Sequence, residues 1–129
     1  MLLFGVNASG KSSYSKAVGI AVIMAQAGMY VPATSMRFWP FQYIFTRIRN
    51  NDDIHRSLSS FAVEVKELNI ILQHANSRGL VLGDELCCGT ENNGATALVA
   101  AVLEELDKRG TKYVFATHFH RLVEMPCVR

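Results

Sequence analysis

Apolar and polar residues alternate in blocks along this chain. Short, wholly apolar runs are separated by longer stretches in which apolar residues recur every three or four positions. The short runs predict strands covered on both faces, and the longer stretches predict amphipathic helices. We expect buried strands at residues 1–4, 43–48, 80–82 and 113–116, and helices at residues 11–30, 61–77 and 92–108. Strands that alternate with helices are typical of a parallel α/β sheet.

Glycines and prolines mark the ends of these elements. Gly28 and Pro32 predict the end of the first helix, and Gly110 the end of the third. Gly83 is unusual inside a buried strand and indicates a close backbone approach. Six small or apolar residues share one face of the first helix, the pattern of a buried face: Ala17, Ile20, Ala21, Met24, Ala25 and Gly28.

Composition narrows the class of protein. The length of 129 residues suits one domain, and 50% hydrophobic with 19% charged residues excludes intrinsic disorder. A net charge of +2 does not favour a chain that coats nucleic acid or a membrane surface. We see neither a membrane span nor a secretory signal. Three cysteines form no disulfide framework and fit a reducing, intracellular compartment, mitochondrial or nuclear in a eukaryote.

The most specific motif lies at residues 5–12, between a predicted strand and a predicted helix. Its sequence fits G-x-x-x-x-G-K-S/T, the phosphate-binding P-loop, or Walker A motif. Such a loop turns backbone N–H groups toward phosphates at the positive end of the helix. Lys11 is expected to reach the β- and γ-phosphates of ATP, and the Ser12 hydroxyl to bind Mg²⁺. The expected nucleotide-binding residues are Gly5, Asn7, Ser9, Gly10, Lys11, Ser12 and Ser13.

Two acids follow the apolar run at residues 80–82. This segment, residues 80–85, fits a Walker B pattern, although a strand that ends in two acids is often only a solvated strand end. Asp84 is expected to hold Mg²⁺ through water. Glu85 is expected to orient the water that attacks the γ-phosphate.

His118 follows the last predicted strand. A histidine at the carboxyl end of a strand in an α/β sheet faces the ligand crevice, where it can contact the γ-phosphate. The other reading is a surface histidine in a loop. His118 and His120 also resemble a pair of metal ligands, but two ligands alone are weak evidence for a metal site.

Together these segments resemble the ABC-type ATPase domain of the MutS family of DNA mismatch-repair proteins. For example, the run from Phe115 to His120 is similar to the family's F-A-T-H-Y-H. The matching segments are residues 5–14, 26–33, 44–53, 59–67, 84–90 and 115–120. The resemblance implies a P-loop NTPase fold with a parallel sheet flanked by helices. It makes residues 1–129 a single partial ATPase domain, truncated at both ends.

The resemblance also implies a dimer in which two subunits share each ATP. Ser59 and Ser60, in the segment 59–67, would be the signature that contacts the γ-phosphate bound by the partner subunit. A plain helix N-cap is the alternative role for these serines. Glu85 and His118 would be the catalytic residues, His118 as the family's switch histidine. Mismatched double-stranded DNA would be bound by domains that this chain lacks, and no membrane is implied.

Cys87 and Cys88 depart from the family pattern, which has Gly-Arg there. This form resembles a divergent branch with organellar and giant-virus members. A redox switch is disfavoured because neighbouring thiols rarely form a strain-free bridge.

The sequence therefore predicts an Mg²⁺-dependent ATPase coupled to mismatch recognition. One alternative is another ABC-type ATPase, such as a transporter or recombination subunit, but the absent L-S-G-G-Q signature argues against it. The other is a non-hydrolysing, nucleotide-dependent dimerisation module. Glu85 argues against that module, whereas Cys87 and Cys88 leave it open.

Overall fold

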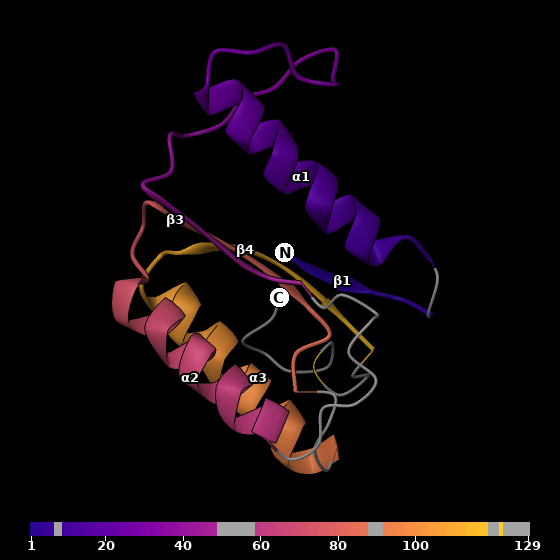
Figure 1. Cartoon of the computed structure of the whole chain (residues 1–129), viewed down its shortest axis with the longest axis vertical. Helices are drawn as coiled ribbons and strands as arrows, with labels where there is room; N and C mark the ends of the chain where they lie inside the picture. The colour runs from indigo at the N-terminus through magenta and orange to yellow at the C-terminus, as the bar shows by residue number, and fades with distance from the viewer. Residues whose placement is uncertain (7–8, 49–58, 88–91, 119–121, 123–129) are drawn as a thin grey trace.

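A computed structural model describes residues 1–6, 9–48, 59–87, 92–118 and 122. These residues form a four-stranded, wholly parallel sheet with helices on both faces (Figure 1). The strands are β1 (Leu2–Phe4), β2 (Tyr43–Arg47), β3 (Gly79–Asp84) and β4 (Lys112–Thr117), in the order β1-β4-β3-β2. The helices are α1 (Lys11–Gln26), α2 (Ser59–His74) and α3 (Asn92–Lys108). The predicted parallel α/β sheet is confirmed.

The central strands carry two cores, one on each face of the sheet. Figure 1 shows α1 alone on one face and α2 beside α3 on the other. The core beneath α1 consists of Val22, Leu80, Leu82 and Val114. On the opposite face, Val81 and Phe115 pack against α2 and α3. Every position of β3 is buried, so its unbroken apolar run indicated two covered faces correctly.

The edge strands differ from the prediction of fully buried strands. Phe4 in β1 is 43% exposed, and no residue of β2 is fully buried. Among the described residues, β1 pairs only with β4, and β2 only with β3. An edge position therefore leaves these apolar strands half-covered.

The buried face of α1 is not the predicted one. Ser15, Gly19 and Val22 are buried, whereas Ile20 is 56% exposed. The reason is close approach: a Cβ atom added at Gly19 would lie 2.5 Å from Leu82 Cδ1. Small residues, not large apolar ones, therefore let this helix lie against the sheet.

The ends of several elements also differ from the prediction. Helix α1 ends at Gln26 rather than Tyr30, and Gly28 follows it with a φ of +73°, the left-handed conformation that favours glycine. Helix α2 spans Ser59–His74 rather than residues 61–77, whereas α3 has its predicted bounds. Gly83 is closely approached, but by a side chain instead of backbone, because an added Cβ would lie 2.7 Å from the Phe115 ring.

Candidate functional site

The strand register gathers the polar segments at one edge of the sheet. Phe4 pairs with Thr117, and Asp84 pairs with Ala116. The residues that follow β1, β3 and β4 therefore meet at the carboxyl edge, where parallel α/β sheets bind ligands. These residues are Gly5, Glu85 and His118.

The glycine-rich loop enters α1 directly. Gly10 has a φ of +88°, and no side chain among the described residues caps α1, so the N–H groups of its first turn form the positive end of the helix. The Lys11 Nζ donates hydrogen bonds to the carbonyl oxygens of Gly5 and Val6, each at 2.8 Å. A Cβ added at Gly5 would lie 3.2 Å from Ser9 Oγ, so Gly5 and Ser9 lie close together. Among the other expected phosphate-binding residues, Ser12 and Ser13 lie in the first turn, and Asn7 lies outside the described residues.

Asp84 ends β3 on the face that carries α1. It is 4% exposed, and its Oδ1 is buried with no hydrogen-bond partner among the described residues. Alternation along the strand puts its side chain on the same face as Leu82, beneath the helix that Ser12 begins. A buried carboxylate oxygen without a partner is costly, so this atom suits a cation or a cation-bound water.

Glu85 and His118 lie side by side in the next positions along the edge. The Glu85 Oε1 is 3.9 Å from His118 Nδ1, and the two side chains are 34% and 43% exposed. The Glu85 N–H donates to the carbonyl oxygen of Ala116 at 2.9 Å, which extends the pairing of β3 with β4 by one residue. A solvent-accessible carboxylate and imidazole therefore stand together beyond the strand ends.

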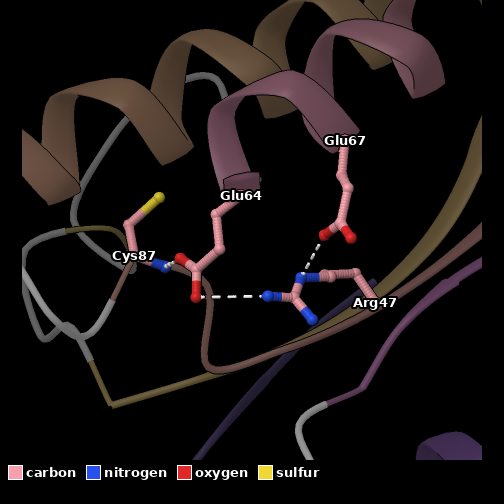
Figure 2. Close-up of polar contacts among 4 residues, drawn as sticks. All are labelled: Arg47, Glu64, Glu67 and Cys87. Atoms are coloured by element: carbon pink, nitrogen blue, oxygen red, sulfur yellow. Dashed lines mark hydrogen bonds and ion pairs between the residues drawn. The ribbon is translucent and has the colours of Figure 1, made fainter. Parts of the chain in front are cut away.

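A buried carboxylate joins the turn after β3 to helix α2 (Figure 2). The Cys87 N–H donates to Glu64 Oε2 at 2.9 Å, and Arg47 Nη2 lies 3.4 Å from Glu64 Oε1. Arg47 Nε also forms an ion pair with Glu67 Oε2 at 2.7 Å. No role for the side chains of Arg47, Glu64 and Glu67 was predicted from the sequence, although all three lie in segments that match the family pattern. The three-residue spacing of Glu64 and Glu67 places both on one helix face.

The Cys87 side chain is fully buried at this junction. Burial, and secondly the Glu64 carboxylate, raise the pKa of its thiol to about 11, and Arg47 opposes them. Its φ of +60° is a conformation that favours glycine, which stands at this place in the family pattern.

The expected signature lies in the first turn of α2, whose backbone begins at Ser59 and Ser60. These serines therefore form part of the helix instead of preceding it. The segment Asp52-Asp53, and Cys88, Gly89, Thr90 and His120, lie outside the described residues.

These features define a three-layer α/β domain whose polar groups meet at the carboxyl edge of its sheet. Residues 1–128 match the family MutS domain V, so the chain belongs to the MutS family, as the resemblance predicted. No described helix is long and apolar enough to cross a membrane.

Named relatives cover nearly the whole chain. It is 47% identical over 125 residues to a mitochondrial DNA mismatch repair protein MutS homologue of Sarcophyton glaucum, covering 97% of this chain and 13% of the relative. It is 44% identical over 123 residues to a putative homologue from Acanthamoeba polyphaga mimivirus, covering 93% and 11%. It is 47% identical over 125 residues to MutS of Lactobacillus delbrueckii subsp. bulgaricus, covering 96% and 15%. The chain thus spans a small part of these relatives' length.

Proposed function

We propose that this chain binds and hydrolyses ATP with Mg²⁺ as part of a mismatch-repair protein. The observation that carries the proposal is the strand register, which aligns the ends of β1, β3 and β4. It brings the glycine-rich loop, Asp84-Glu85 and His118 to one edge. The biological role is supported by two relatives that are named as DNA mismatch repair proteins.

Nucleotide binding rests on the glycine-rich loop and the start of α1. The N–H groups of the loop and first turn would bind the phosphates, since the first turn forms the positive end of the helix. Lys11 would exchange its two backbone carbonyl acceptors for the β- and γ-phosphates. Charged phosphate oxygens are stronger acceptors than neutral carbonyls, so this exchange is favourable.

The Mg²⁺ site would use Ser12 and Asp84. The unpartnered Oδ1 of Asp84 fits the cation or its water shell. The described residues contain no cluster of three or more potential metal-ligating acids, histidines or cysteines. A small number of protein ligands is typical of Mg²⁺, because this ion keeps several of its waters and is bound together with substrate phosphates. Mg²⁺ would supply charge stabilisation for the transferring phosphoryl group.

Hydrolysis would use Glu85 and His118. The Glu85 carboxylate would accept a hydrogen bond from the attacking water and orient it for in-line attack on the γ-phosphate. His118, 3.9 Å from that carboxylate, would donate to a γ-phosphate oxygen. Both side chains are accessible enough to meet a nucleotide. A second MutS-type subunit would complete the site with Ser59 and Ser60, and other parts of the full-length protein would bind mismatched DNA.

The proposal is tested by comparing two lysines of the same helix. In the full-length protein, Lys11→Ala removes the proposed phosphate ligand, whereas Lys16→Ala removes an exposed charge one turn later. Isothermal titration with ATP and Mg²⁺ should show affinity falling at least ~30-fold for Lys11→Ala, as expected for two lost charge-assisted hydrogen bonds. Lys16→Ala should bind as the wild type does. Equal affinities in the two variants would remove the nucleotide-site assignment.

A further inference from the structure

The turn that follows β3 holds two residues in an unfavourable backbone conformation. Glu85 has a φ of +48° and Cys87 a φ of +60°, and they are the only non-glycine residues with positive φ among those described. Residues that have a Cβ atom rarely adopt this backbone conformation, so contacts with the surrounding structure must stabilise it. One such contact is a hydrogen bond: the Cys87 N–H donates to the buried Glu64 carboxylate at 2.9 Å.

Glu64 is itself held from a third element. Arg47, at the end of β2, pairs with Glu64 at 3.4 Å and with the more exposed Glu67 at 2.7 Å. In Figure 2 the Glu64 carboxylate stands between the Arg47 guanidinium and the Cys87 backbone nitrogen. The ion pair balances the buried charge and fixes one oxygen, which leaves the other aimed at the turn. Glu67 has no such contact with Cys87.

We propose that Glu64 is a positioning residue: its carboxylate holds the Glu85–Cys87 turn and thereby ties the proposed water-orienting carboxylate to helix α2. The first turn of α2 carries Ser59 and Ser60, so a movement of this helix is transmitted through Glu64 to the turn that bears Glu85. The catalytic part of this inference rests on the proposed ATPase function.

The experiment shortens each of two neighbouring carboxylates by one methylene in the full-length protein. Glu64→Asp keeps the buried charge but withdraws its oxygens from Cys87 by about 1.5 Å, the length of one carbon–carbon bond. Glu67→Asp makes the same change in a side chain that, within the described part of the chain, pairs only with Arg47, and it serves as the matched control. Glu64→Gln removes the charge but keeps an oxygen that accepts the Cys87 N–H.

Steady-state hydrolysis of Mg²⁺-ATP is the first readout. Glu64→Asp should lower kcat about 10- to 100-fold, because misplacing a reacting group by about 1 Å has effects of this size. The KM for ATP should change less than about 3-fold, since the phosphate-binding loop is untouched. Glu67→Asp should stay within about 2-fold of wild type in kcat. Glu64→Gln should have a kcat much closer to wild type than Glu64→Asp has, since one acceptor oxygen suffices for the Cys87 N–H.

Alkylation of Cys87 is the second readout and is independent of ATP. In a Cys88→Ser background, iodoacetamide should modify the buried Cys87 about 10-fold faster in Glu64→Asp, because the released turn opens more often. Glu67→Asp should leave that rate unchanged. Equal kcat or equal alkylation rates in Glu64→Asp and Glu67→Asp would overturn the inference. A wild-type protein without ATPase activity would overturn the proposed function instead, and alkylation would still decide whether Glu64 holds the turn.

Discussion

Adding one methyl group at Gly83 should destabilise the sheet next to the proposed site. In Gly83→Ala the new Cβ would lie 2.7 and 2.8 Å from two atoms of the Phe115 ring. Ordinary carbon–carbon contacts are about 3.5–4.0 Å, so the two groups must separate by roughly 0.8 Å or more. The Phe115 ring is 2% exposed and packs against the core beneath α2 and α3, so it has little space to move.

The size of the effect follows from two opposing contributions. Overpacking a buried site costs about 1–3 kcal/mol. Replacing glycine in a strand interior by alanine regains about 0.5–1 kcal/mol of backbone entropy. The net loss in the free energy of opening should be about 0–2.5 kcal/mol, and its mid-range value of about 1.25 kcal/mol corresponds to roughly 8-fold faster amide exchange in β3 and β4.

Amide hydrogen exchange, monitored by mass spectrometry, measures the change in the free energy of opening in peptides that cover the two strands. Gly94→Ala is the control: its Cβ meets nothing within 4 Å, and it lies in α3, where alanine should stabilise by about 0.5–1 kcal/mol. In a Phe115→Leu background the ring is absent, so Gly83→Ala should lower the free energy of opening little or not at all. The same cost in both backgrounds would refute the clash as the cause.

Three further outcomes are expected in the full-length protein. Glu85→Gln should slow hydrolysis about 10²-fold while ATP still binds, because a positioned acceptor is lost; hydrolysis at the wild-type rate would assign that role to another group. Mixed Lys11→Ala and Ser60→Ala subunits should regain about a quarter of wild-type turnover, since half of the random dimers hold one intact site; no regain in freely mixing subunits would contradict a shared site. The pKa of Cys87 is raised from its ordinary value of 9.0 to about 11, so between these pH values the folded protein keeps the thiol proton that the unfolded chain loses. The free energy of unfolding should therefore fall as pH rises from 9 to 11, and fall less in Cys87→Ala; equal slopes in the urea-derived values would refute the shift.

Local signals determined much of this protein's organisation. The apolar run at β3 and the spacing within α3 indicated their elements because each pattern lies within one contiguous segment. The phosphate-binding role proposed for the glycine-rich loop could be predicted for the same reason, since its motif consists of eight consecutive residues. Membership of the MutS family was also readable, because its motifs occur in order along the chain.

Tertiary packing decided the rest. The buried face of α1 could not be read from apolar spacing, since Gly19 is buried for its small size against Leu82, which lies more than 60 residues away in the sequence. The link from Glu64 to Cys87 spans 23 residues and two elements, and hydrophobic periodicity contains no information about such a contact. Which strand ends meet at one edge likewise depends on the order β1-β4-β3-β2. Strand order and helix approach are set by the combined packing of all layers, so only the folded chain brings these residues together.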